Sequence, residues 1–291
     1  MRALFLIGAP MLCMGFTASA EANSRQADTK WGFSGGGGAA ISPHYSGDDD
    51  YAISALPYAR VSYSDLFYAS VPEGANLKLY EGNGFRAVAT AKFTFDREED
   101  GSAPFRIAGK RTADLVGLGD VAASIELGGT LRYQKGNWSL SGSARQAVSG
   151  HEGLVGEIAT RYSRSIRGYG PPIRQSIGPS LNFGDGNYMN AYYGVTPSQS
   201  QASGLETFSA SGGLYSAGLS LSAMAPVTQR SALFLQASIS QLTGDAKNAP
   251  LVRDRGDPAQ AFGGLFWVYT FGQDASRGRP SGTKSAGRPS N

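Results

Sequence analysis

Hydrophobic and polar residues alternate with a period of two along most of the chain. In Val121–Tyr133, "VAASIELGGTLRY", one face carries apolar side chains and glycine, and the other carries Ser124, Glu126 and Arg132. This alternation is typical of a β-strand with one apolar and one polar face. Helical periodicity is not visible after the first twenty residues, so the pattern predicts an all-β fold. Further segments with this pattern are 85–95, 138–145, 154–163, 217–225, 232–240 and 264–271.

Two all-β architectures produce such a pattern, a soluble sandwich and a transmembrane barrel. Here the apolar face is built largely from Ala, Gly and Leu, with aromatic residues at the segment ends, whereas a sandwich core needs bulky side chains. The opposite face carries Arg and Glu, as a polar lumen would. Backbone groups in lipid need partners, so such a sheet must close on itself. We therefore predict a transmembrane antiparallel β-barrel of the bacterial outer membrane with about 12 strands, 10 being the alternative.

The strand boundaries also predict which connections lie on each side of the membrane. An even count places both ends of the barrel in the periplasm, together with the turns 184–187 and 226–230. The loops 195–208 and 244–260 then lie outside, and the long segment 96–120 lies in the periplasm. Pro57 cannot donate a hydrogen bond and predicts a bulge. The predicted strands lie near 31–41, 51–63, 66–80, 85–95, 121–133, 137–149, 154–165, 173–184, 187–194, 209–225, 231–243 and 261–271.

The two ends of the chain differ from the body in composition. Residues 1–20 carry Arg2, a short apolar run and the small-x-small sequence Ala18-Ser19-Ala20, which predicts a cleaved signal peptide. Residues 21–30 are then a short periplasmic segment and 31–271 the barrel. The Gly/Ser/Pro-rich stretch 272–291 predicts a disordered basic tail. With a signal peptide and no apolar spanning helix, the expected destination is the outer membrane of a Gram-negative cell.

Charge and cysteine content exclude other classes of protein. The formal net charge is +3, but Arg2 contributes +1 and the tail +3, so the body between them is close to neutral at −1. A nucleic-acid partner would require a dense basic face on the folded domain, and none is expected. The single cysteine, Cys13, is removed with the signal peptide, so no disulfide is expected.

Aromatic residues gather at two places where strands are predicted to leave the membrane. Tyr188, Tyr192 and Tyr193 precede Gly194 and Pro197, which end the strand and begin a polar loop. The last strand carries Trp267, Tyr269 and Phe271 on one face. Amphipathic rings suit the headgroup layer, so both groups predict an aromatic girdle.

Charged residues on the polar face form a predicted lumen network. Its members are Arg132, Arg145, Arg161, Glu126 and Glu157. These side chains could cross-link the interior as structural ion pairs. Alternatively, they could line an open pore, and three arginines on one wall would then favour anions.

Catalysis is not expected. The chain contains two histidines: His44 lies near Asp48, Asp49 and Asp50, and His151 lies near Ser149 and Glu152. Either group could orient a base or hold a cation, but polar turns of this kind are usually only solvated, and the spacing matches no catalytic motif. "SGGGGAA" at 34–40 lacks the Gly-Lys-Ser/Thr of a phosphate loop. We therefore predict no enzyme activity, cofactor or metal.

Several stretches resemble the MipA/OmpV family of MltA-interacting outer-membrane proteins. The most specific are "YMNAYYGVTPSQSQASGL" (188–205) and "LTGDAKNAPLV" (242–252), and further matches are 55–69, 117–129, 218–252 and 262–271. The resemblance covers residues 31–271. It implies an outer-membrane barrel that scaffolds a lytic transglycosylase and a peptidoglycan synthase, although similar proteins are linked to adhesion or porin-like transport. Family chains usually end near the position of Phe271, and this one continues for 20 residues.

The resemblance and the strand count together predict a partner surface. Murein enzymes work in the periplasm, and 96–120 is the only long segment that the count places there. Its apolar and charged residues Phe105, Arg106 and Ile107 are the predicted contacts. The other expected partners are outer-membrane lipids and the barrel-assembly machinery, which reads a C-terminal aromatic strand.

Overall fold

The computed structural model describes residues 31–103, 105–168 and 171–271. The predicted signal peptide, the segment 21–30 and the C-terminal tail lie outside the described residues. The strands are β1 (Trp31–Pro43), β2 (Tyr51–Tyr63), β3 (Phe67–Val71), β4 (Gly74–Gly82), β5 (Phe85–Thr94), β6 (Arg106–Ala108), β7 (Ser124–Lys135), β8 (Trp138–Ala147), β9 (Leu154–Ile166), β10 (Ile173–Gly184), β11 (Gly213–Pro226), β12 (Ser231–Leu242) and β13 (Ala259–Phe271). The helices are α1 (Gly186–Tyr193), α2 (Pro197–Ser203), α3 (Gly244–Asn248) and α4 (Pro250–Arg255).

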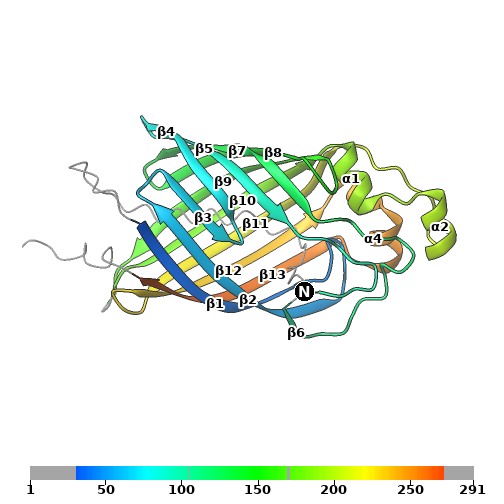
Figure 1. Ribbon diagram of the computed structural model, residues 1–291, viewed down its shortest axis with the longest axis horizontal. Coiled ribbons are helices and arrows are strands. Elements are labelled where there is room, and N and C mark those ends of the chain that lie inside the picture. The colour runs from blue at the N-terminus through cyan, green and yellow to red at the C-terminus, as the bar shows by residue number, and fades with distance from the viewer. Residues whose placement is uncertain (1–30, 104, 169–170, 272–291) are drawn as a thin grey trace, which may run out of the picture.

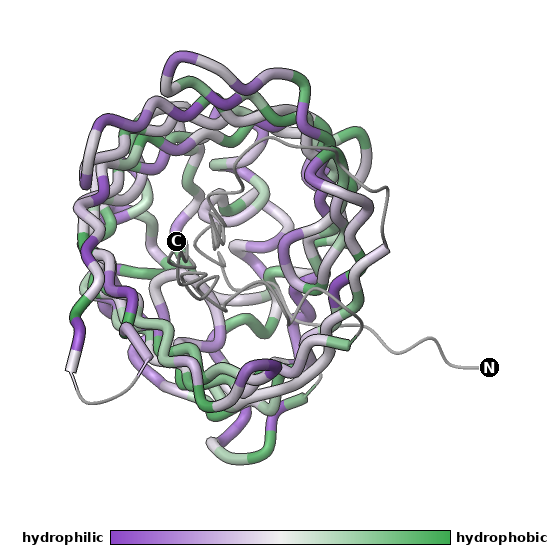
Figure 2. The backbone as a smooth tube through the Cα atoms, turned by 90° about the vertical axis from the view of Figure 1, so that its left-hand side faces the viewer, coloured by the Kyte–Doolittle hydropathy of each residue, from purple (hydrophilic) through white to green (hydrophobic). Residues whose placement is uncertain are grey.

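Twelve antiparallel strands close into a barrel. Strand β1 pairs with β2 on one side and with β13 on the other, and every other barrel strand pairs with its neighbours along the chain, β5 being followed by β7. The closed ring is visible along the barrel axis in Figure 2. Short β6 lies outside the ring order and adds two pairs to β2. The predicted barrel and its strand number are confirmed.

The strand number is right because two errors in the predicted boundaries cancel. The predicted strand 66–80 is a hairpin of β3 and β4, joined at Pro72 and Glu73. Proline ends the ladder there, and Gly74, with φ of 83°, reverses the chain in a conformation that favours glycine. The predicted strand 187–194 is helix α1. One crossing was therefore missed and one was added.

The extra crossing corrects the placement of the segment 96–120. We call the barrel end that carries Trp31 and Phe271 the terminal end, and the opposite one the loop end (Figure 1). Leu115 and Leu118 pack with Leu251 of α4 at the loop end. The prediction that this segment shares the periplasmic side with the termini is therefore wrong. The turn 184–187 also lies at the loop end, whereas 226–230 lies at the terminal end as predicted.

Because the β3–β4 hairpin is short, β3 pairs with only part of the β2 edge, and other residues pair with the rest. The pairs of β3 with β2 stop at Ala59, and further along β2 the amide of Ala55 donates to the carbonyl of Phe105 at 2.8 Å. Pro57 lies on this same edge between the two pairings, where no amide donor is needed. The pairing of β1 with β2 runs through Pro57 without a register shift, so the bulge predicted there is absent.

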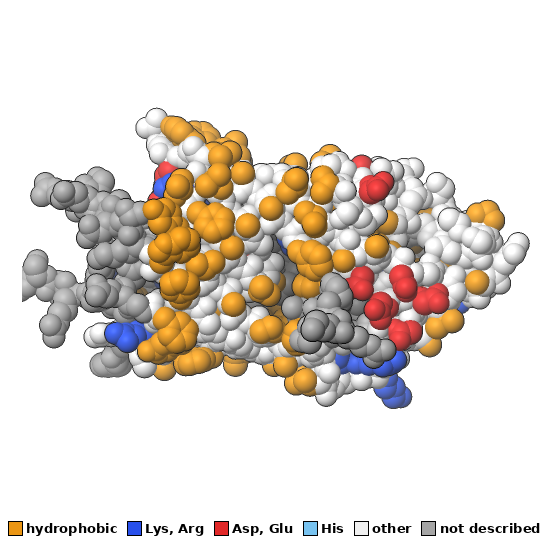
Figure 3. All heavy atoms as spheres, viewed as in Figure 1, with side chains coloured by type: hydrophobic (Ala, Val, Ile, Leu, Met, Phe, Trp, Pro, Cys, Tyr) orange, Lys and Arg blue, Asp and Glu red, His pale blue; other side chains and the backbone are white. Residues whose placement is uncertain are grey.

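The two faces of the wall follow the period-two pattern. On β7, Leu127 and Leu131 point outward and are about half exposed, while Glu126 points inward and is 3% exposed. Apolar side chains are spread over the face of the wall seen in Figure 3 and are most dense toward the terminal end. Among the described residues, no helix has both the length and the apolar composition needed to cross a membrane.

The loop end is closed by a body that we call the plug, made of helices α1 to α4 and the segment 95–123 (Figure 1). Local sequence explains why helices form there. The Asp185 side chain accepts the amide of Tyr188 at the start of α1, and Thr196 and Gln199 form a reciprocal capping box around α2, whose first residue is Pro197. Two buried clusters lie at this end: one joins the helices to Val155, Tyr215 and Leu242 of the barrel strands, and the other joins Leu115 and Leu118 to Leu251 of α4.

Candidate functional site

The predicted lumen charges all lie on inward-facing positions, but they form two groups at different heights along the barrel axis. Near the loop end, Glu126 of β7 pairs with Arg145 of β8, with 2.8 Å between Oε2 and Nε. Glu126 also accepts a 2.6 Å hydrogen bond from the Thr94 hydroxyl, and its Oε1 lies 3.5 Å from Nε2 of His151. These contacts hold the carboxylate in a fixed position although it is almost fully buried.

Closer to the terminal end the lumen wall is more basic. Arg132 of β7 lies directly opposite Arg86 of β5. Arg161 of β9 lies opposite Ser139 of β8, nearer still to the terminal end. Like charges on directly opposite residues repel each other, and acidic groups offset this at the rim, where Glu81 binds the Arg86 guanidinium at 2.9 Å and Asp65 lies 3.3 Å from it.

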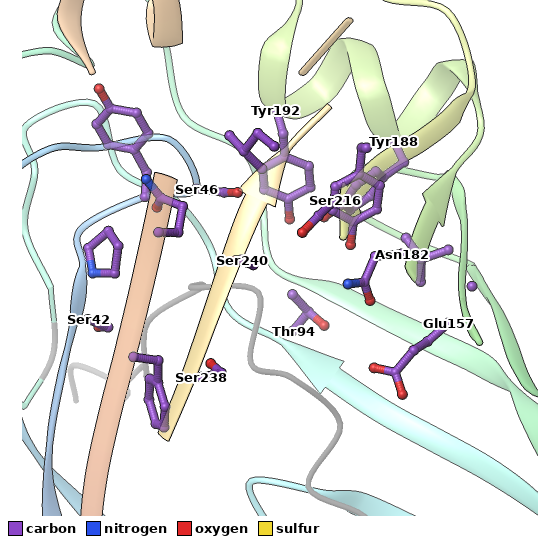
Figure 4. A pocket seen from close by; sticks show the side chains of 18 of the residues that line it. Ser42, Ser46, Thr94, Glu157, Asn182, Tyr188, Tyr192, Ser216, Ser238 and Ser240 are labelled. Atoms are coloured by element: carbon purple, nitrogen blue, oxygen red, sulfur yellow. The ribbon is translucent and has the colours of Figure 1, made fainter. Parts of the chain in front are cut away.

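A cavity of about 150 Å³ lies in the lumen beneath the plug (Figure 4). Many hydroxyl and amide side chains line it, and Lys92, Arg97, Arg145, Glu126 and Glu157 supply charge. The Gln236 Oε1 atom is buried without a hydrogen-bond partner among the described residues. Other polar residues that line the cavity are Ser42, Ser46, Thr94, Asn182, Ser216, Ser238, Ser240 and Gln260.

Tyrosines form the roof of this cavity, which corrects one predicted role. Tyr188 and Tyr193 are buried in the plug, and Tyr192 packs against the same cluster. The ring of Tyr188 lies 4.8 Å from that of Tyr192 and 5.2 Å from that of Tyr215. The Tyr193 hydroxyl is 2.8 Å from the Ser46 Oγ. The prediction that Tyr188, Tyr192 and Tyr193 form a membrane girdle is therefore wrong.

The other aromatic group lies where a girdle requires it. Trp267 and Phe271 point outward near the terminal end and are about half exposed, and the ring of Tyr269 lies 4.9 Å from that of Phe271. Further outward aromatic residues at the same end are Trp31, Phe33, Phe85, Tyr133 and Trp138. An apolar band bounds this end of the wall in Figure 3.

The predicted partner contacts are part of the wall rather than of a free periplasmic surface. Phe105 accepts the Ala55 amide, and Arg106 begins strand β6 beside β2. Ile107 is 65% exposed on the outer surface. All three residues lie beside the loop-end part of β2. They are therefore at the opposite end of the barrel from the face that was predicted to be periplasmic.

Hydrogen bonds from two arginines hold the parts of the plug together. Arg97 donates to the carbonyl of Tyr192 at 2.9 Å, and its guanidinium lies 5.8 Å from the centre of the Tyr192 ring. Burial lowers the pKa of Arg97. Arg255 of α4 donates to the carbonyl of Asp114 at 2.6 Å. These bonds join the segment 95–123 to α1 and α4.

Tyr215 is a lining residue that sequence reasoning missed. The register of β10 with β11 shifts between Asn182 and Phe183, so that Ser216 pairs with Asn182 while Leu214 pairs with Phe183. Tyr215 falls between these pairs and turns inward beside Ser216. A bulge of this kind leaves no sequence signal, whereas Gln236 and Ser238 follow the period-two pattern and could have been found.

Comparison with known proteins agrees with this architecture. The family profile described as "MltA-interacting protein MipA" matches residues 35–271, which span the barrel and the plug. The chain belongs to this MipA family.

Individual MipA relatives are distant. "Putative outer membrane protein YiaT" of Escherichia coli K12 is 26% identical over 154 residues, which is 52% of this chain and 59% of YiaT, less than two-thirds of that relative. An outer membrane channel from Pseudomonas putida F1 has a TM-score of 0.39 and 14% identity, covering 87% of this chain and 98% of that one. OmpT of Vibrio cholerae has a TM-score of 0.30 and 10% identity, covering 86% and 100%. The protein is thus a MipA-family barrel of the outer membrane.

Proposed function

We propose that this protein is a noncatalytic barrel that holds a lytic transglycosylase, and with it a peptidoglycan synthase, at the inner face of the outer membrane. The family description supports the first partner, because it names an interaction with MltA. The observation that carries the proposal from the structure is the packed plug. A barrel whose loop end is packed with the buried side chains of α1, α3 and α4 serves as an anchor without giving solutes free passage.

The histidine environments support a noncatalytic role. Nδ1 of His151 accepts the amide of Gly153 at 3.0 Å, and Nε2 faces Glu126. Both ring nitrogens of His44 are buried without a partner. Among the described residues, neither ring is hydrogen-bonded to a hydroxyl that it could activate as a nucleophile.

The terminal end is the face that an enzyme in the periplasm would reach. It presents short connections between strands, and two of them expose apolar side chains, Leu66 at 48% and Val227 at 55%. A few apolar anchors usually carry most of the binding energy of an interface. We therefore place the partner contacts on the turns 64–66 and 227–230 instead of 96–120.

A binding experiment with face-specific variants tests this placement. The barrel in lipid nanodiscs is expected to bind a purified lytic transglycosylase of the MltA type. We expect the double variant Leu66→Asp, Val227→Asp to weaken that binding by at least about tenfold, the loss of roughly 1.4 kcal/mol at the interface. The matched control is Val116→Asp, which introduces the same charge at an exposed apolar residue of the loop end. Equal binding by the double variant, or loss of binding in the control alone, contradicts the placement.

A narrow channel is the second candidate function. The polar cavity and the facing pair Arg86 and Arg132 favour it, because a basic wall in an open lumen would select anions. The two functions differ in conductance: a channel gives stable, anion-selective steps in a planar bilayer, and an anchor gives none.

A further inference from the structure

Three aspartates from two separate segments meet at the loop end. Asp48 and Asp49 lie in the connection between β1 and β2, and Asp114 lies in the segment 95–123. One carboxylate oxygen from each of the three lies within 4.8 Å of the others. Within the described part of the chain, no Lys or Arg forms an ion pair with these carboxylates. Carboxylates this close repel each other unless a proton or a cation lies between them. Acidic side chains gather at this end of the molecule in Figure 3.

Buried oxygen atoms without partners point to a cation at this position. Asp48 is fully buried: its Oδ1 accepts the amide of Asp50 at 3.0 Å, but its Oδ2 has no partner among the described residues. The Tyr45 hydroxyl is equally buried and equally unpartnered. Tyr45 belongs to the same turn as Asp48, because its carbonyl accepts the amide of Asp48 at 3.1 Å. Leaving such oxygens unsatisfied is costly, and a bound cation would remove that cost.

The ligand atoms define the class of cation. The cluster offers oxygen atoms alone, which suits the hard cations Ca²⁺ and Mg²⁺ and disfavours Zn²⁺. Calcium accepts six to eight oxygen ligands in flexible geometry, whereas Mg²⁺ demands near-ideal octahedral geometry and usually keeps several waters, so a cluster of three aspartates suits Ca²⁺ better. We propose that Asp48, Asp49 and Asp114 form a Ca²⁺ site, with water or backbone carbonyls completing the shell.

Such a site would fasten the plug to the barrel. The connection that carries Asp48 already contacts the plug, because Ser46 bonds to Tyr193 and the carbonyl of Gly47 accepts the amide of Asp257 at 3.0 Å. The same connection meets the barrel wall where the Gly47 amide donates to Gln260 Oε1 at 3.1 Å. A calcium ion shared with Asp114 would add a link from this connection to the segment 95–123. Calcium outside the cell would then stabilise the closed state.

Calcium titration of the refolded full chain, free of lipopolysaccharide and treated with EDTA, tests the proposal. Calorimetry is expected to show one Ca²⁺ site with a Kd of roughly 10⁻⁵ to 10⁻³ M and weaker binding of Mg²⁺. At 1 mM Ca²⁺ the Tm should rise by about 2–5 °C relative to EDTA. Absence of a calorimetric signal up to 10 mM Ca²⁺ overturns the site.

Two isosteric variants separate metal binding from a purely structural role. Asp48→Asn and Asp114→Asn should each abolish the calcium-dependent rise in Tm. In EDTA they should melt at or above the temperature of the wild type, because a repelling carboxylate is removed. The control Glu152→Gln, another acid at the loop end, should keep the full response. Wild-type calcium binding in both aspartate variants, or melting below the wild type in EDTA, contradicts the assignment.

Discussion

Replacing Leu127 by arginine will lower the free energy of unfolding by about 2–4 kcal/mol, because the charge then faces the hydrocarbon layer. Leu127 points outward from the apolar part of the wall and pairs with Ala91 of β5 and Gln146 of β8. A guanidinium at that depth has no water or counter-charge within reach unless its side chain extends toward an interface. Unfolding in lipid vesicles, followed by tryptophan fluorescence against denaturant concentration, gives the value.

The matched control is Ser141→Asn on the opposite face. Ser141 lies opposite Arg132 and faces the polar lumen, where an amide finds hydrogen-bonding partners. We expect a change of less than about 1 kcal/mol, as for most substitutions that create no cavity and no buried unpaired group. If the asparagine variant is the less stable of the two, the inward and outward faces of these strands are reversed.

Replacing Tyr193 by alanine will open the plug while the barrel stays folded. The ring is 1% exposed in the main buried cluster, and its hydroxyl bonds to Ser46 at 2.8 Å. Removing a buried aromatic side chain costs about 3–5 kcal/mol. The wall strands hold one another through backbone hydrogen bonds. The substitution therefore lowers the free energy needed to open the plug locally and leaves the barrel folded. Trypsin should cut at Arg253 and Arg255 of α4 on the order of 100-fold faster, as cleavage follows the population of the open form.

Tyr193→Phe is the control for this experiment. It keeps the packed ring and loses only the hydrogen bond to Ser46, worth about 1 kcal/mol. Its cleavage should therefore accelerate much less. Heat-modifiable migration on gels should show an intact barrel in both variants. Equal cleavage rates for the two variants would mean that the ring does not hold the plug closed.

The period-two pattern was sufficient to predict the barrel and its two faces. The alternation on β7 placed Leu127 toward lipid and Glu126 and Arg132 toward the lumen, as the structure does. A strand between lipid and a polar lumen must alternate apolar and polar side chains, so the type of each residue indicates which face it lies on.

The plug could not be predicted from the same pattern. Tyr188 and Tyr192 are spaced by four residues, which suits a helix as well as a strand, and the decisive signals were Asp185 and the capping box around Thr196. The hairpin at Pro72 was missed because its strands are short. That one missed reversal moved 96–120 to the wrong side and, with it, the predicted contacts at Phe105 to Ile107. The meeting of Asp48 with Asp114 depends on that placement and has no local signal.

Conductance of the purified wild-type protein in planar lipid bilayers tests the central claim most directly. Buried tyrosines and the buried side chains of α1, α3 and α4 pack at the loop end, and the cavity beneath them measures about 150 Å³. We predict no stable conductance steps for the wild type, and steps after Tyr193→Ala has loosened the plug. Stable, ion-selective steps in the wild-type protein would contradict the closed anchor and identify the barrel as a channel.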